Sequence, residues 1–172
     1  MKKLITSFTL FLTFSVFTFG QTEHLEKFEY SETGINDYIV TKIEDKTTNE
    51  IYSKTINWIK ETYKNPDKVI KMEIENEKVR INSVASNLLF VKKMSFSLDY
   101  IIELSIKDGK YKFELISLTA GGTDYKKIPN FKTDNKLIKN FGESPKRIEN
   151  YLNNLNESLR NYILGEKKND DW

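Results

Sequence analysis

The segment Met94–Lys107 alternates apolar and polar side chains along its whole length. Every second residue is large and apolar: Phe96, Leu98, Tyr100, Ile102, Leu104 and Ile106. Because successive side chains of a strand point to opposite faces, this pattern predicts a long strand with one buried face and one solvated face. Such strands are typical of an antiparallel sheet covered on one side only. Asp108-Gly109 then predicts a two-residue hairpin into a strand that buries Tyr111, Phe113 and Leu115.

Two amphipathic helices are expected to supply that cover. Thr47–Lys64 begins with a Thr-x-x-Glu capping box and carries an apolar stripe; Asn65-Pro66 ends the helix. The members of the stripe are Ile51, Tyr52, Thr55, Ile56, Trp58, Ile59 and Tyr63. The second helix starts at Ser144-Pro145, as an N-cap followed by proline at the first helical position, and Gly165 ends it. Each helix is stable only when its stripe packs against a partner layer.

Three further strands are expected before the long hairpin. They are Ile35–Ile43, Val69–Glu75 with Ile70, Met72 and Ile74 on one face, and Lys78–Asn82. The pattern lapses between residues 119 and 143, where a short helix is expected at 133–140. The predicted order is therefore β-α-β-β-β-β-α. An α+β sandwich of two layers, with an antiparallel sheet and both helices on one of its faces, satisfies every apolar stripe.

This order of elements is that of the TBP-like fold, and one stretch carries a closer resemblance. Asp37–Ile81, about a quarter of the chain, resembles an exported bacterial family described as a domain of unknown function with TBP-like fold. The spacing of Tyr52 and Trp58 is the most specific part of the match. The resemblance implies the fold and an exported setting, and it implies no activity.

The N-terminus has the features of a signal peptide. Lys2 and Lys3 precede an apolar run, and small residues stand at Thr18 and Gly20, which predicts cleavage after Gly20 and no transmembrane segment afterwards. The expected organisation is a signal peptide at 1–20, a polar segment at 21–34, one domain at 35–165 and a polar tail at 166–172. The chain has no cysteine, so neither a lipoprotein anchor nor a disulfide is expected. The protein is predicted to be periplasmic or secreted.

Charge argues against a nucleic-acid partner. Cleavage after Gly20 removes two of 27 basic residues and none of 25 acidic ones, which leaves 25 of each and a formal net charge of zero. The strand positions expected to be exposed also mix both signs. They are Lys71, Glu73, Arg80, Asn82, Ser95, Ser97, Asp99, Glu103, Lys112 and Glu114. A neutral exported protein with such a face is predicted not to bind DNA in the manner of the TATA-binding protein.

No catalytic or metal-binding motif is found in the sequence. His24 is the only histidine, and neither zinc spacing, a calcium loop, a glycine-rich phosphate loop nor a nucleophile elbow occurs. No cofactor is expected. Carboxylate pairs such as Asp99 and Glu103 could serve a small secreted hydrolase, although 25 acidic residues make such pairs common on a solvated surface. Catalytic residues are therefore not assigned.

Two stretches are candidate binding sites. Asn87–Lys93 places consecutive apolar residues, including Leu89 and Phe90, between two strands. It forms either a packed hairpin arm or an exposed lip that grips a partner or the outer membrane. The loop Gly121–Lys127 combines Gly121 and Gly122 with Tyr125 and Lys126, and it is either a plain connection or a loop that closes on a ligand. The leading hypothesis is a non-catalytic binding or interaction module of the cell envelope, with an unknown protein or small ligand as its partner. The alternatives are the hydrolase and a structural envelope component.

Overall fold

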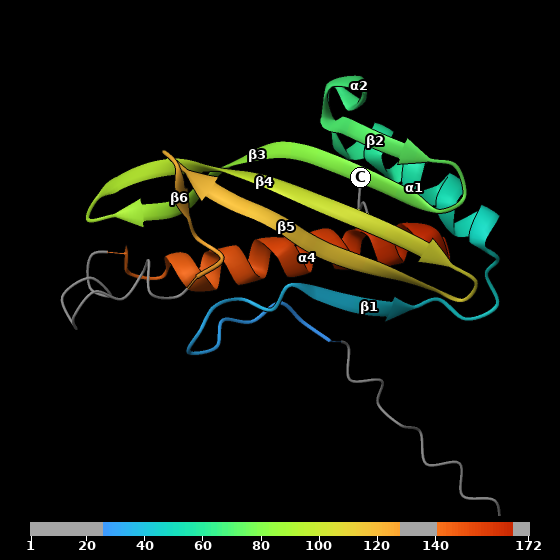
Figure 1. Ribbon diagram of the computed structural model, residues 1–172, viewed down its shortest axis with the longest axis horizontal. Helices are drawn as coiled ribbons and strands as arrows, with labels where there is room; N and C mark the ends of the chain where they lie inside the picture. Colours follow the sequence, from blue (N-terminus) through green and yellow to red (C-terminus); the bar gives the residue numbers. More distant parts are fainter. Residues whose placement is uncertain (1–25, 128–140, 167–172) are drawn as a thin grey trace, which may run out of the picture.

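The structure, a computed structural model, describes residues 26–127 and 141–166 (Figure 1). The predicted signal peptide, the expected helix at 133–140 and the end of the tail lie outside the described residues. The helices and strands are β1 (Tyr38–Lys42), α1 (Thr48–Thr62), α2 (Pro66–Val69), β2 (Ile70–Ile74), β3 (Lys78–Val91), β4 (Met94–Lys107), β5 (Lys110–Ala120), β6 (Thr123–Asp124) and α4 (Ser144–Leu164).

One antiparallel sheet forms the first layer. Its strands follow the order β1-β5-β4-β3-β2, and the two-residue β6 extends β5. The long helices α1 and α4 contact each other and pack on the same face of the sheet; in Figure 1 the strands pass in front of α4. The predicted two-layer TBP-like α+β fold is confirmed. The sheet consequently has one face in the core and one face open, which we call the open face.

Helix α1 forms as its sequence predicts. Thr47 accepts the Glu50 amide while the Glu50 carboxylate accepts the Thr47 amide, so both halves of the capping box are present. The Asp108 carboxylate, in the β4–β5 turn, accepts the amide of Thr48 at 2.6 Å. The buried stripe includes Trp58, whose indole N–H donates to Ser158 of α4 at 3.1 Å. Each such buried side chain contributes roughly 1.5–3 kcal/mol, which fixes the helix on the sheet.

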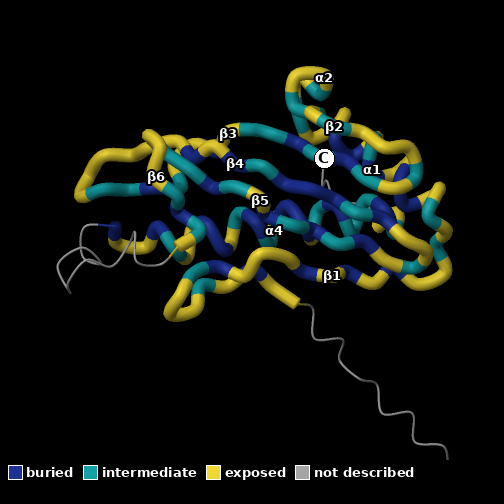
Figure 2. Tube along the Cα trace, in the orientation of Figure 1, coloured by how far each residue is buried: buried dark blue, intermediate teal, exposed yellow. Residues whose placement is uncertain are grey.

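Helix α4 is joined to the sheet by a buried polar side chain as well as by its apolar stripe. The amide of Asn156 hydrogen-bonds the Thr41 hydroxyl of β1 at 3.2 Å and accepts the Tyr111 hydroxyl of β5 at 2.9 Å. At its ends, Ser144 accepts the amide of Phe90 at 2.9 Å, and Gly165 adopts the left-handed conformation with φ of 74°. Figure 2 shows the buried stripe of α4 running beneath the buried parts of the strands.

Packing extends further toward the N-terminus than the expected domain boundary at residue 35. Phe28 is buried and meets the ring of Phe113 edge-on at 5.7 Å. Its amide and carbonyl both bond the side chain of Asn153 on α4, at 2.8 and 2.9 Å. Next to the edge strand, the Glu26 carboxylate accepts the amide of Val40 at 3.2 Å. Within the segment expected to be polar, Glu26 and Phe28 thus contact β1, β5 and α4.

Two strands differ from the sequence prediction. Strand β3 continues to Val91, and the expected break after Asn82 is absent because the chain stays paired to β4 across a bulge between Ala85 and Leu89. In β2, a bulge between Ile70 and Met72 reverses the faces. Met72 and Ile74 therefore lie on the open face, whereas the alternation predicts them on the same face as Ile70.

Candidate functional site

The open face is assembled from polar rows that cross the strands. Side chains of paired residues share a face, so the register defines each row. One row joins Met72, Arg80, Glu103, Glu114 and Tyr38, and the next joins Ile74, Lys78, Ser105, Lys112 and Val40. A third row, at the end of the sheet, joins Lys107, Lys110 and Lys42. These three rows form the basic half of the open face.

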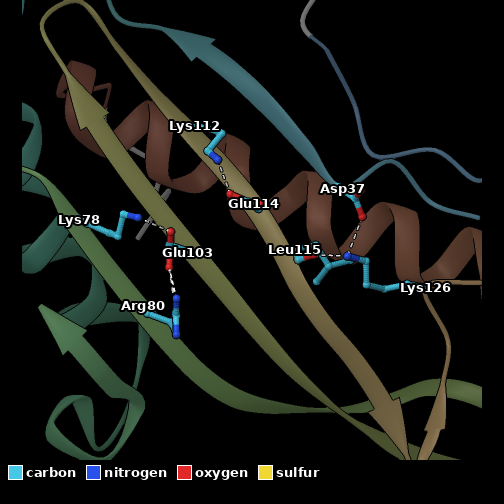
Figure 3. A network of polar contacts seen from close by, with 8 residues as sticks. All are labelled: Asp37, Lys78, Arg80, Glu103, Lys112, Glu114, Leu115 and Lys126. Carbon is cyan, nitrogen blue, oxygen red and sulfur yellow. Dashed lines mark hydrogen bonds and ion pairs between the residues drawn. The ribbon is translucent and has the colours of Figure 1, made fainter.

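Glu103 occupies the centre of the basic half. The residue is only 5% exposed although it points away from the helices, because the side chains of neighbouring strands cover it. Lys78 donates to one carboxylate oxygen at 2.8 Å and Arg80 Nε to the other at 2.9 Å (Figure 3). Burial alone would raise the pKa of Glu103, but the hydrogen bonds from Lys78 and Arg80 outweigh it and lower the pKa below its ordinary value. Glu103 is thus a fixed anion between two cations.

Lys112 on β5 and Tyr38 on the edge strand β1 extend the basic half beyond Glu103. The Lys112 ammonium pairs with Glu114 and also lies 5.4 Å from the centroid of the Tyr38 ring. Tyr38 itself is 52% exposed, and its neighbour Val40 is 37% exposed. At the opposite edge, Ile74 is 43% exposed. Apolar side chains therefore stand at both edges of the basic half, with cations between them.

The sign of the charge changes along the strands. Beyond the row of Asn82, Ile101 and Ser117, the register brings Val84, Asp99, Thr119 and Asp124 together on the open face. Beside them, Lys126 pairs with Asp37 at 2.7 Å and donates to the Leu115 carbonyl at 2.6 Å (Figure 3). A shallow hollow of about 290 Å³ lies here, and its lining includes Ile116, Asp124 and Lys127.

The residues of the predicted binding loop Gly121–Lys127 have different positions in the structure: a turn, the core and the rim of the hollow. Gly121 and Gly122 form the exposed turn between β5 and β6, with φ of 54° and 80°. Tyr125 is buried and packs edge-on against Phe141, so its ring belongs to the core. Lys126, held by the contacts above, is the member of this group that reaches the hollow.

The apolar stretch around Leu89 lies within strand β3, and Leu89 packs in the core. Leu89 is buried, and Phe90 is partly covered by the Arg147 guanidinium, whose carbon lies 4.9 Å from the ring centroid. The more exposed apolar residues of this hairpin are Met94 and Phe96 on β4. The structure therefore does not bring Leu89 and Phe90 together with Gly121, Gly122 or Lys126 in one surface site.

Asp99 and Glu103 share the open face as expected, but they lie four residues apart on β4. At about 3.4 Å per residue, their Cα atoms are separated by roughly 14 Å. Paired carboxylates of glycoside hydrolases stand roughly 5–9.5 Å apart. The cationic neighbours of Glu103 also hold it ionised, which disfavours it as a general acid.

Within residues 26–127 and 141–166, no three His, Cys, Asp or Glu side chains gather as metal ligands. Among the helices of the same ranges, none combines the length and apolar character needed to cross a bilayer.

Sequence reasoning missed most of the basic half. Lys42, Lys78, Lys107 and Lys110 were absent from the expected exposed positions, and Glu73 lies instead beside the helices, where its carboxylate accepts the Tyr52 hydroxyl. The alternation of the strands could have found these lysines. The residue number of each differs by an odd number from that of a buried residue of its own strand, such as Ile39 or Tyr111, which places the lysine on the opposite face.

Comparison with known proteins agrees with this architecture. Residues 38–120 match the family model described as a domain of unknown function (DUF4468) with TBP-like fold. A crystal structure of a DUF4468 family protein from Bacteroides ovatus is similar with a TM-score of 0.57 and 15% identity, covering 81% of this chain and 90% of that one. A TBP-like protein from Parabacteroides distasonis gives a TM-score of 0.49 and 17% identity, with 72% and 91% covered. No curated protein matches the chain.

Proposed function

We propose a binding function for this chain, whose residues 38–120 belong to the family of domains of unknown function (DUF4468) with TBP-like fold. In this proposal the protein is a non-catalytic interaction module of the bacterial cell envelope, and the open face is the surface that meets its partner. Export rests on the N-terminal sequence, where a basic start, an apolar run and small residues precede Gly20.

The observation that carries the proposal is the exposure of large apolar side chains on the open face. Tyr38, Val40, Ile74, Val84 and Ile116 lie on this face or at its edges, and each is between 37% and 55% exposed. Scattered apolar residues are ordinary on any surface, but these share one side of one sheet, opposite the helices. A sheet face of this kind offers apolar contact area on a rigid support, which suits recognition of another molecule.

Site-specific photo-crosslinking in a bacterium that exports the protein tests the surface. A photoreactive amino acid at Tyr38 or Ile74, the exposed apolar residues at the two edges of the basic half, is expected to give a discrete crosslinked product. The same residue at Lys60, which is exposed on α1, serves as the matched control and should give none. Products at Lys60 without products at Tyr38 and Ile74 would exclude the open face as the binding surface.

Cell fractionation with mass spectrometry tests the location independently. The mature protein is expected in the periplasm or the medium, with its first residue at Gln21. Recovery of the intact N-terminus in the cytoplasm would exclude an envelope role.

A further inference from the structure

We propose that the basic half of the open face binds an acidic protein segment that lies across the strands and carries an apolar anchor near each end. The inference rests on the proposed function, because it names the class of partner that the same face would take.

The charge of the basic half is concentrated well beyond that of the chain. Six cations share its three rows: Lys42, Lys78, Arg80, Lys107, Lys110 and Lys112. Two anions, Glu103 and Glu114, share them as well, so the formal charge is 6 − 2 = +4, whereas the whole chain carries +2. The excess therefore comes from the arrangement of the strands, and it favours an acidic partner.

The third row, Lys42, Lys107 and Lys110, contains cations and no anion. Lys78, Arg80 and Lys112 pair with Glu103 and Glu114, but Lys42, Lys107 and Lys110 make no ion pair with any residue of the described ranges. The carboxylate nearest in sequence to Lys107 and Lys110 belongs to Asp108, and it accepts hydrogen bonds from Thr48 at the start of α1. Like charges directly opposite each other on neighbouring strands destabilise a sheet. An acidic segment across this row would remove that repulsion.

Apolar side chains define where the segment ends. Tyr38 and Val40 stand on β1 at one edge, and Met72 and Ile74 stand on β2 at the other. Four strand spacings separate these edges, which is about 19 Å at roughly 4.8 Å per spacing. A helix rises about 1.5 Å per residue, so about 13 residues of helix span this distance. The face therefore fits a helix of three to four turns with an apolar residue near each end and acidic residues between them.

Two carboxylates outside the basic half favour a short protein segment over a long uniform polyanion. Asp99 and Asp124 lie on the same face, beyond the central row of Ile101. A nucleic acid or an anionic membrane that covered the whole face would meet these carboxylates with its own negative charge. A segment confined to the basic half avoids them. Duplex DNA, anionic vesicles and a second copy of this chain are the competing occupants that the experiment distinguishes.

The probe is a fluorescein-labelled, end-capped helical peptide of about 16 residues, with a leucine near each end of one helical face and glutamates between them. Binding is followed by fluorescence anisotropy at low and at physiological salt. We expect saturable binding that weakens with salt, and at least a tenfold weaker affinity when Lys42, Lys107 and Lys110 are all replaced by glutamate, since about 1.4 kcal/mol corresponds to a factor of ten. The milder triple replacement by glutamine should weaken binding in the same direction.

Matched controls separate the surface from the charge change. Replacing Lys60, Lys64 and Lys68 by glutamate alters the net charge equally, but these exposed lysines lie outside the open face, so the affinity should change by less than about twofold. Two control peptides, with glutamine for glutamate or alanine for leucine, should each bind more weakly. Circular dichroism and urea unfolding confirm that every variant is folded.

Several outcomes would overturn the inference. One is peptide binding that the Lys42, Lys107 and Lys110 replacements leave unchanged. Others are tighter binding of duplex DNA or of phosphatidylglycerol vesicles than of the peptide, and sedimentation showing a stable dimer that those replacements dissolve. Crosslinking from Tyr38 and Ile74 together with a negative peptide result would reject the acidic partner and leave the open face as a binding surface. Absence of both would reject the proposed function as well.

Discussion

Glu103→Gln is the substitution that most directly tests the electrostatics of the open face. Glutamine has nearly the shape of glutamate, so the change removes the charge and leaves the packing in place. The carboxylate is buried, with Lys78 on one oxygen and Arg80 on the other. The substitution leaves both cations without their anion, and glutamine retains one carbonyl oxygen as an acceptor.

The expected loss follows from the exposure of the partners. Removing one member of a fully buried ion pair costs about 3–5 kcal/mol. Here the side chains of Lys78 and Arg80 are 30% and 41% exposed, so water can solvate them after the substitution. We therefore expect a loss of about 1–2 kcal/mol in the free energy of unfolding. For a domain of this size, that corresponds to a fall in Tm of roughly 2–8 °C.

Urea unfolding at several pH values measures this loss and its origin. The pKa of Glu103 is lower in the folded protein than its ordinary value of 4.5. A lowered carboxyl pKa stabilises the folded state above the unfolded pKa, and this stabilisation is lost as the pH falls through the folded pKa. The difference between wild type and Glu103→Gln should therefore be constant above about pH 5 and shrink below pH 4.5.

Glu114→Gln is the matched control on the neighbouring strand. Its carboxylate is more exposed and, among residues 26–127 and 141–166, forms an ion pair with Lys112 alone, so we expect a loss below about 0.5 kcal/mol. Equal stability of Glu103→Gln and wild type at neutral pH would refute the account of Glu103 as an anion that stabilises the folded sheet. A difference of the same size at pH 3 and pH 7 would refute the electrostatic origin.

Three further changes test other parts of the structure. Gly34→Ala should reduce stability to urea by about 1–3 kcal/mol, because its Cβ would overlap the backbone carbonyl of Lys126; unchanged stability would mean that this approach is not close. Asn156→Leu should cost about 1–3 kcal/mol, because the hydroxyls of β1 and β5 lose their side-chain partner; a more stable variant would contradict it. Hydrogen bonds from the Thr47 backbone and from Lys46 lower the pKa of Glu50 to about 2, so Glu50→Gln should reduce Tm above pH 4.5 and have a fading effect toward pH 2.

The local structure of the long elements follows from the sequence. Helix α1 has the predicted capping box, β4 has the predicted bounds, and the β4–β5 hairpin turns at Asp108-Gly109. In each case the signal is contained in neighbouring residues: a cap, a period of two, or a turn dipeptide. The apolar stripes of these elements also require two layers, so the fold class could be derived before any strand order was known.

Bulges and strand order cannot be predicted from such local signals. The bulge in β2 moves Ile74 to the open face, and the bulge in β3 keeps the segment around Leu89 in the sheet. Both depend on pairing with a neighbouring strand, because an extra residue is tolerated only where the partner strand fixes the register. The bonds of Lys126 to Asp37 and to the Leu115 carbonyl arise in the same way, from segments distant in sequence.

The residues of the basic half can vary independently of the residues that form the core. Lys42 lies beside Lys110 because β1 pairs with β5, although the two strands are far apart in the chain. The opposite face needs only that Ile39, Tyr111 and their neighbours stay apolar. Polar positions of the same strands can therefore change sign without loss of the core, which alters the partner and preserves the architecture. For this reason the charge pattern of the open face, rather than the packing signature of α1, is where related domains of this fold should differ in the partners they bind.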